Sequence, residues 1–388
     1  MDSKRTSDSN SASPPSAGRL SRLQALLLAD PDNHRLAREC TDLALACGDY
    51  DFVLQRTEKI LSTTPDELTA RFDRASALIG KRHYADAIAI LRDIVAQRPD
   101  ITAAALNLGL CHYRLAQYTE ALAPLEAVYA SGDRSAGLLR LLVSTCHHLG
   151  LMEKAVTLAK ANPQPAMKDA MLAGVYAIAF LDSKVPREAS RWAARALAAD
   201  PDSIDGLTVG ATLDAARMLV VHAREKYERV LELSPENGRA WIGLGTLALL
   251  ERDLPRAQTL LARGAEFMPG HVGSWHVLAW AYLLGGDLEK AEQILEKSVQ
   301  MDRNFAEAHG GLAAVAALRG DRAAAERGID VALRLDPKCL SAQFARSVLM
   351  SRSGDVDGGK ELIRTTVAKL SPADGSLLSR VIEDATRH

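Results

Sequence analysis

Apolar and polar residues follow a recurring order along most of the chain, and this order predicts pairs of helices. In one clear example, Trp241, Leu244 and Ala248 recur at the three- and four-residue spacing of a single helix face. Residues 252–254 interrupt the pattern, a second helical pattern follows, and Pro269 ends it. The stretch after Pro269 repeats the same order, so the helix pair is the expected unit of the fold.

The prolines that close these units keep one period over most of the chain. They are separated by one constant interval, or by multiples of it, at Pro31, Pro65, Pro99, Pro201, Pro235, Pro269 and Pro337. One register therefore extends over residues 34–373, which holds ten repeats of about 34 residues each. A single helix pair cannot bury its own apolar face, so we expect about ten antiparallel pairs stacked into an all-α solenoid.

The repeat resembles that of the tetratricopeptide repeat family. That family has Trp-x-x-Leu-Gly-x-x-Tyr in its first helix, Gly-x-Tyr-x-x-Ala at the turn and second helix, and a closing Pro. The matches include Trp241, Leu244 and Gly245 in a first helix, Gly48-Asp49-Tyr50 at a turn, and Tyr118 with Ala121 in a second helix. The chain departs from the pattern at the closing proline, replaced by Asp133, Met167, Arg303 and Ser371, and at the small slot, which holds Thr41 and Ser347. The resemblance implies a right-handed superhelical solenoid that binds other proteins in a concave groove lined by the first helices.

The ends of the chain differ from the repeats. Residues 1–18 are rich in Ser, Pro and Asn, which predicts a disordered tail that is either passive or an export signal. Residues 19–33 predict a single helix before the first repeat, and residues 374–388 predict a C-terminal capping helix.

Composition and charge narrow the class of protein. The net charge of −2 offers no global basic field for nucleic acid or an anionic membrane. The sequence has no run of about 20 apolar residues that could span a membrane, and no hydrophobic N-terminal segment typical of a secretory signal. The five cysteines are odd in number and scattered, which predicts reduced thiols and a cytoplasmic location.

The groove-facing slots of the first helices, as the resemblance places them, are mostly uncharged. Only Arg38, Asp42 and Arg140 carry charge there, and a large apolar surface on a soluble protein usually marks a binding site. The predicted partner-binding residues are Phe72, Leu106, Leu110, Tyr113, Ile178, Ile242, Leu249, His276, Trp280, Leu283 and Phe344. The groove is expected to be most apolar around Ile242, Leu249, Trp280 and Leu283. An alternative for Leu249 and Leu283 is packing against the neighbouring first helix.

Candidate chemistry is sparse. The run Cys146-His147-His148 points its side chains in different directions on a helix, so we expect no metal site there. Relatives that grip the acidic tails of chaperones use Lys, Arg and Asn in the groove; Asn107 lies near such a slot, but Phe72 and Ser76 replace the expected Lys and Asn. Phosphate-binding, serine-hydrolase and zinc-protease motifs are absent from the sequence. We therefore expect no catalytic residues and no cofactor.

The sequence thus predicts a non-catalytic scaffold, adaptor or chaperone-like binder of protein partners. Its expected ligand is an apolar helix or extended segment, possible settings include a bacterial secretion or assembly system, and nucleic acid is not expected. One alternative is a regulatory or substrate-presenting subunit of an enzyme or transferase complex. Another is self-association, through the groove or through an uncovered end.

Overall fold

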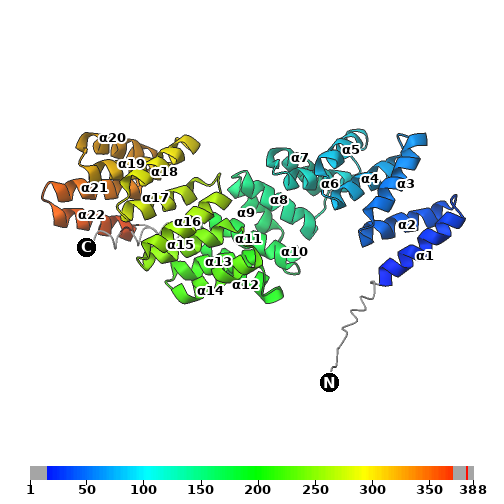
Figure 1. Cartoon of the computed structure of the whole chain (residues 1–388), viewed down its shortest axis with the longest axis horizontal. Helices are drawn as coiled ribbons and strands as arrows, with labels where there is room; N and C mark the ends of the chain where they lie inside the picture. Colours follow the sequence, from blue (N-terminus) through cyan, green and yellow to red (C-terminus); the bar gives the residue numbers. More distant parts are fainter. Residues whose placement is uncertain (1–14, 370–381, 383–388) are drawn as a thin grey trace, which may run out of the picture. The chain divides into compact units, whose positions relative to one another are not determined.

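The computed structural model describes residues 15–369 and residue 382, and all regular secondary structure in this part of the chain is helical (Figure 1). The expected all-α solenoid of helix pairs is confirmed. Residues 1–14 of the expected tail, and all but residue 382 of the expected capping helix, lie outside the described residues. The helix expected over residues 19–33 is α1 (Pro15–Ala29), which begins with a proline at the first turn, where no amide donor is needed.

The first helices of successive pairs begin at a constant interval, equal to the period of the sequence. These helices are α2 (His34–Cys47), α4 (Leu68–Gly80), α6 (Thr102–Arg114), α8 (Ala136–His148), α11 (Ala170–Asp182), α13 (Ile204–Ala216), α15 (Gly238–Leu250), α17 (Val272–Leu284), α19 (Ala306–Arg319) and α21 (Leu340–Arg352).

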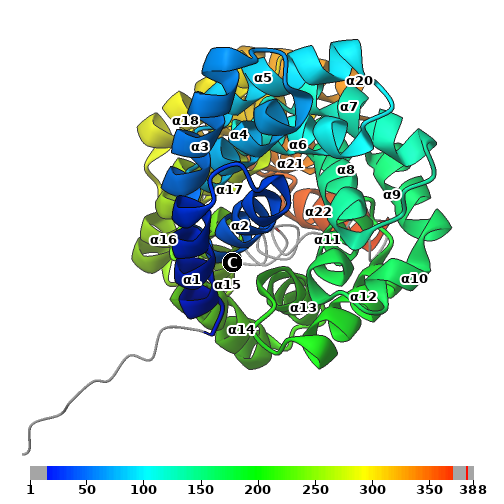
Figure 2. The ribbon, with the colours of Figure 1, turned by 90° about the vertical axis from the view of Figure 1, so that its right-hand side faces the viewer.

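The second helices follow after a short turn. They are α3 (Tyr50–Thr63), α5 (Tyr84–Gln97), α7 (Tyr118–Ala130), α9 (Met152–Ala161), α12 (Pro186–Ala199), α14 (Val220–Leu233), α16 (Leu254–Phe267), α18 (Leu288–Met301), α20 (Arg322–Leu335) and α22 (Val356–Lys369). A short additional helix, α10 (Pro163–Ala166), lies between α9 and α11. The two helices of a pair lie side by side, as α13 and α14 do in both ribbon views (Figure 1, Figure 2).

Local sequence explains where these helices begin and end. Several second helices start after an Asp whose side chain accepts a hydrogen bond from a backbone amide in the first turn: Asp49, Asp253, Asp287 and Asp321. Each turn between the paired helices contains one residue in the left-handed region. The residues are Gly48, Arg82, Ala116, Gly150, Lys184, Met218, Arg252, Gly286, Gly320 and Gly354, again one period apart. This conformation stops the first helix and lets the chain reverse.

The chain divides into two compact units, unit 1 up to Ala155 and unit 2 from Val156. In unit 1, the first helices α2, α4, α6 and α8 lie against one another in that order. The core beside them is built from buried residues of both helix types, among them Ala75, Leu91, Ile94 and Leu108.

In unit 2, the largest core cluster gathers alanines with Leu261, Trp280, Leu295 and Ile363. The first helices α19 and α21 approach each other very closely. A Cβ atom at Gly310 would lie 2.5 Å from the backbone nitrogen of Ala342, so glycine is required at this crossing.

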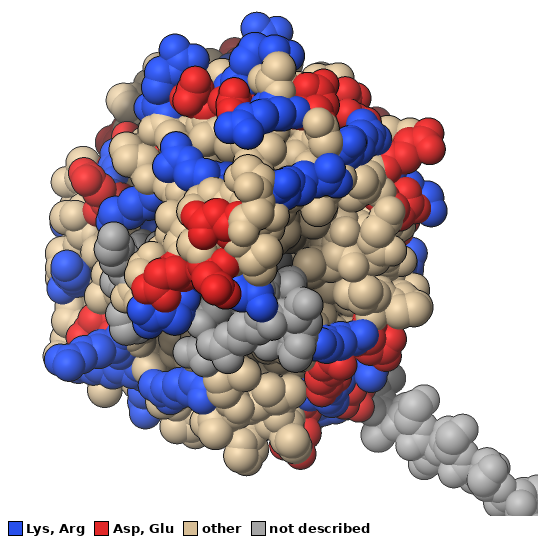
Figure 3. Space-filling view, turned by 90° about the vertical axis from the view of Figure 1, so that its left-hand side faces the viewer, with Lys and Arg blue, Asp and Glu red and all other residues tan. Residues whose placement is uncertain are grey.

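Exposed charged residues of both signs occur throughout the described residues. On the face shown in Figure 3, Lys and Arg are interspersed with Asp and Glu among uncharged residues. Pairs such as Arg319 with Glu292, at 2.6 Å, neutralise charge locally. This face therefore carries no extended field of one sign.

Candidate protein-binding face

The first helices of unit 1 present a row of half-buried apolar side chains. Phe72 lies in α4, and Leu106, Leu110 and Tyr113 lie in α6. Leu106, Leu110 and Tyr113 are spaced by four and three residues, so they share one face of α6. We define the unit 1 face by these residues and their neighbours on the same side: Arg38, Asp42, Phe72, Asp73, Ser76, Ile79, Leu106, Asn107, Leu110, Tyr113, Arg140 and Ser144.

The apolar residues of α4 at the centre of this face are anchored on the core of unit 1. Phe72 and Ile79 pack on the core between α4, α5 and α6, while part of each side chain stays exposed. An apolar side chain anchored on a core and half open to solvent loses little conformational entropy when a partner covers it. The centre of the face is therefore suited to binding apolar groups.

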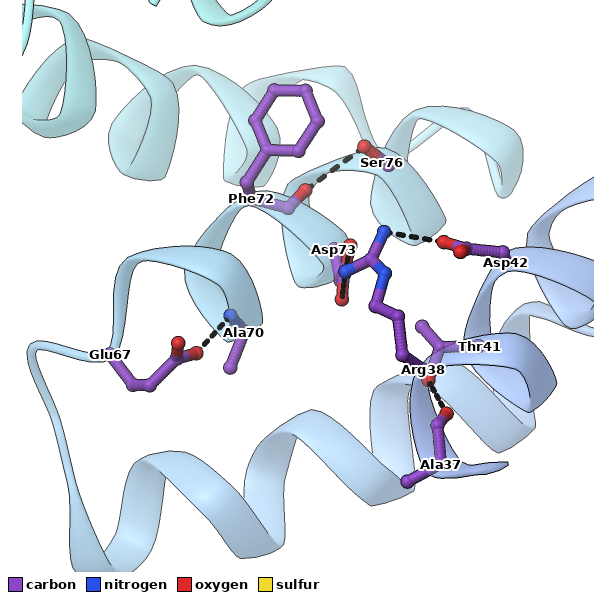
Figure 4. A network of polar contacts seen from close by, with 9 residues as sticks. All are labelled: Ala37, Arg38, Thr41, Asp42, Glu67, Ala70, Phe72, Asp73 and Ser76. Atoms are coloured by element: carbon purple, nitrogen blue, oxygen red, sulfur yellow. Dashed lines mark hydrogen bonds and ion pairs between the residues drawn. The ribbon is translucent and has the colours of Figure 1, made fainter. Parts of the chain in front are cut away.

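A cluster of charged residues borders the face at α2 (Figure 4). The Arg38 guanidinium donates to both carboxylate oxygens of Asp73, at 2.9 and 3.2 Å, and also to Asp42. Burial raises the pKa of the Asp73 carboxyl, and the attraction of Arg38 offsets this only in part. The Glu67 carboxylate lies near Asp73 and caps α4 through the amide of Ala70. Asp42 and Asp73 therefore both contact the Arg38 guanidinium, and Glu67 lies near Asp73.

The opposite border, at α6 and α8, has aromatic and basic groups. The Tyr118 and His148 rings stack with centroids 4.1 Å apart, and the Tyr113 ring meets the Tyr118 ring edge-on at 5.6 Å. These contacts fix the orientation of the Tyr113 ring. Arg114 is exposed beside Tyr113, and Arg140 lies half-buried on α8.

In unit 2 the structure corrects the expected groove. Ile178 and Ile242 are half-buried, but five other predicted binding residues are buried: Leu249, His276, Trp280, Leu283 and Phe344. Trp280 is only 1% exposed and lies in the largest core cluster. Since a partner cannot reach these five side chains, three of the four residues expected to form the most apolar part of the groove are packed inside the protein, and only Ile242 keeps part of its surface exposed. The packing alternative for Leu249 and Leu283 agrees with their burial.

A buried polar network explains why Trp280 and His276 point inward. The Trp280 indole donates to His276 Nε2 at 3.0 Å, and the same nitrogen lies 3.1 Å from Ser341 Oγ. The Glu307 carboxylate accepts from Ser341 Oγ at 2.5 Å and from the backbone amides of Leu340 and Ser341. The network thus joins the first helices of three successive repeats. Only a weak feature of the sequence indicates this network. Cys339, the residue before α21, provides no side-chain cap, so the first backbone amides of α21 need a hydrogen-bond acceptor from another helix.

The residue types Ser341, His276 and Glu307 do not form a hydrolytic triad. Glu307 contacts the serine and approaches the same ring nitrogen, Nε2, at 3.8 Å, whereas a triad acid orients the base through its other nitrogen. Burial lowers the pKa of His276, with Glu307 acting in the opposite direction, and Ser341 is fully buried. The arrangement is structural.

The run Cys146-His147-His148 was the remaining candidate for metal binding. Cys146 is buried, whereas His148 is exposed and stacks on Tyr118. Across residues 15–369 and 382, no group of three or more His, Cys, Asp or Glu side chains is placed to hold a metal ion. Within the same residues, no helix is long and apolar enough to cross a membrane.

Sequence models described as tetratricopeptide repeat match residues 72–137, 222–270 and 248–315. A search of curated proteins finds no match to this chain. Among solved structures, the chain is similar to YrrB, described as a tetratricopeptide-repeat protein with an unusual peptide-binding site. The identity is 19%, the TM-score is 0.36, and the match covers 50% of this chain and 97% of YrrB.

Residues 34–369 form ten helix pairs, and together with these matches to the family models this identifies the chain as a tetratricopeptide-repeat protein. Such repeats form a class of interaction modules that present helical surfaces to other proteins. The protein is therefore a scaffold for protein–protein interaction.

Proposed function

We propose that this protein is a non-catalytic scaffold that holds an apolar segment of a protein partner against the unit 1 face. The observation that carries the proposal is the row of Phe72, Leu106, Leu110 and Tyr113, which is half-exposed while the equivalent row in unit 2 is mostly buried. Aromatic and large apolar groups at the centre of a polar rim are the usual anchors of protein interfaces.

The test is a photo-crosslinking amino acid placed at Leu106 of the full chain in its native cell. The matched control places it at Leu28 of α1, which is 83% exposed and lies off the face. We expect a covalent adduct of defined mass from position 106 and not from position 28. Phe72→Glu should abolish the adduct, since burying a charge at an apolar anchor costs about 2 kcal/mol or more of binding energy.

The helicity of each variant, measured by circular dichroism, must equal that of the wild type. Equal adducts from both positions, or an adduct that survives Phe72→Glu, would show that partners bind elsewhere on the molecule.

A further inference from the structure

We propose that the turn between α13 and α14 is a docking site for an anionic lipid surface. Residues 217–222 form this turn and the start of α14, and their sequence is Arg-Met-Leu-Val-Val-His, with four apolar residues between two basic ones. We call these six residues the apolar tip. The apolar tip belongs to unit 2 and uses none of the residues of the unit 1 face, so it adds a second kind of partner to the proposed function.

Three of the four apolar side chains of the tip are exposed to solvent. Met218 and Leu219 are each 44% exposed, and Val221 is 67% exposed. Val220 packs on the core cluster that α13 and α14 share, and so it anchors the tip on unit 2. A group of exposed apolar side chains on a soluble protein usually marks a surface that binds a membrane or another protein.

The apolar tip lacks two stabilising features that other turns of the repeat have. Met218 has a φ of +63°, in the region that glycine occupies in five of the ten turns between paired helices. Leu219 takes the N-cap position of α14 and provides no cap, whereas an Asp caps α3, α16, α18 and α20.

This departure from the repeat is confined to one turn. Of the ten turns, all of which lie within residues 15–369, only this one has a large apolar residue at both the left-handed position and the N-cap position. Both residues cost local stability, and their exposed side chains contribute little to the core in return. A sequence that breaks two local rules at one exposed place indicates a function there.

The charges around the apolar tip favour an anionic partner. Arg217 precedes the apolar run, His222 follows it, and both are exposed. The first turn of α14 contains no Asp or Glu, so its own sequence places no carboxylate at the positive end of the helix dipole. Asp214, which precedes the tip, pairs with Lys226, and Glu225 comes only in the second turn of α14.

The shape of the apolar tip favours a lipid surface over a protein pocket. The exposed side chains lie where the chain reverses direction between two helices, so they project from the turn. Apolar side chains that project in this way can enter the boundary between headgroups and acyl chains, which needs no preformed cavity in the partner. Basic residues on both sides of the run then lie at the level of the anionic headgroups, where each cation strengthens binding.

The experiment measures binding of the purified full chain to sucrose-loaded vesicles by sedimentation over a range of lipid concentrations. Vesicles of phosphatidylcholine with an equal part of phosphatidylglycerol are compared with vesicles of phosphatidylcholine alone. We expect the chain to bind the anionic vesicles about fivefold or more tightly than the neutral ones, the effect of one cationic residue close to the surface.

The decisive variant combines Met218→Gly with Leu219→Asp and gives the tip the Gly-Asp sequence of the turns at Gly286 and Gly320. It relieves the positive φ and supplies a cap, so it should raise the midpoint of urea denaturation. It also removes two of the exposed apolar side chains, so it should weaken binding to anionic vesicles about tenfold or more. A general loss of fold would lower the denaturation midpoint instead.

A matched control combines Ala116→Gly with Gln117→Asp. It creates the same Gly-Asp sequence and the same change in net charge at another turn, so binding to anionic vesicles should stay at the wild-type level. A further variant, Arg217→Gln, keeps the apolar side chains and removes one cation. It should weaken binding to anionic vesicles about fivefold and leave binding to neutral vesicles unchanged.

The other outcomes overturn the proposal. They are no binding of the wild type to anionic vesicles, or equal binding by the wild type and the Met218→Gly, Leu219→Asp variant. A dimer seen by light scattering that this variant abolishes, without vesicle binding by the wild type, would assign the tip to a second copy of the chain. The crosslink from Leu106 does not involve the tip, so it tests the proposed function separately.

Discussion

At the residue scale, the left-handed residue in each turn shows how one backbone conformation sustains the repeat. Five of these ten positions are glycine and five are not, yet all have positive φ. In the folded state, a side chain at a positive-φ position costs about 1–2 kcal/mol of stability relative to glycine. The larger conformational entropy of glycine in the unfolded chain offsets about 0.5–1 kcal/mol of this difference. The repeats with Arg82, Ala116, Lys184, Met218 and Arg252 therefore carry local strain that the other repeats avoid.

Two substitutions at this position should have opposite effects on the free energy of unfolding. A Cβ at Gly286 would meet no atom within 4 Å, so only its φ of +79° opposes a side chain there. We expect Gly286→Ala to lower the stability by about 1 kcal/mol and Ala116→Gly to raise it by up to about 1 kcal/mol. Urea denaturation of both variants measures this, and equal stability of Gly286→Ala and the wild type would contradict it.

The buried His276 should make stability depend on pH. Its pKa is lowered from 6.5 because burial disfavours the charged ring. Below about pH 6.5, His276 is protonated in the unfolded chain but stays neutral in the native state. The protein therefore loses stability as the pH falls from about 6.5 toward the native pKa of His276. His276→Gln, which keeps an acceptor for the Trp280 indole, should lose less stability between about pH 7.5 and pH 5.5.

Thermal melts at several pH values measure this difference. The control is His222→Gln on the exposed surface of α14, which makes the same exchange outside the buried network. The pKa of His271 is also lowered by burial, so a part of the slope should remain in His276→Gln.

At the element scale, the N-terminus of α21 is capped by a residue of the preceding repeat. Its N-cap residue, Cys339, supplies no side-chain acceptor, and the Glu307 carboxylate of α19 takes that role at the amides of Leu340 and Ser341, at 2.9 and 3.0 Å. A carboxylate at a helix N-terminus also interacts favourably with the helix dipole.

We expect Glu307→Ala to lower the free energy of unfolding by about 1–2 kcal/mol, since it removes the cap and leaves buried Ser341 without its acceptor. Glu307→Gln keeps a neutral acceptor and should cost less. Hydrogen exchange at the Leu340 and Ser341 amides should accelerate in Glu307→Ala. Unchanged exchange at both amides would show that the cap is dispensable.

At the scale of the whole molecule, the proposed binding function is assigned to one of the two compact units. In unit 2 the predicted binding residue Trp280 contributes to the core, whereas Phe72, Leu106, Leu110 and Tyr113 in unit 1 are half-buried. Trp280→Ala should therefore lower the stability of unit 2 by about 3–5 kcal/mol, and Leu91→Ala should destabilise unit 1 by about 2–5 kcal/mol.

Hydrogen exchange resolved along the chain distinguishes the two effects. The crosslink from Leu106 should survive Trp280→Ala and weaken with Leu91→Ala, because only the latter lies beneath the unit 1 face. Loss of the crosslink in Trp280→Ala alone would contradict this assignment.

The sequence alone determined the fold class, because helical spacing and the repeat period are local patterns that each pair satisfies with its neighbours. The same period placed Phe72, Leu106, Leu110 and Tyr113 on first helices, where they are half-exposed. The period did not reveal which residues at the equivalent positions of unit 2 are buried. That depends on how closely neighbouring first helices approach, and Gly310, with the Glu307 contact to the start of α21, brings α19 and α21 together. The burial of Trp280 and Phe344 was thus decided by tertiary packing, since exposure is set by the distance between repeats and not by the pattern within one.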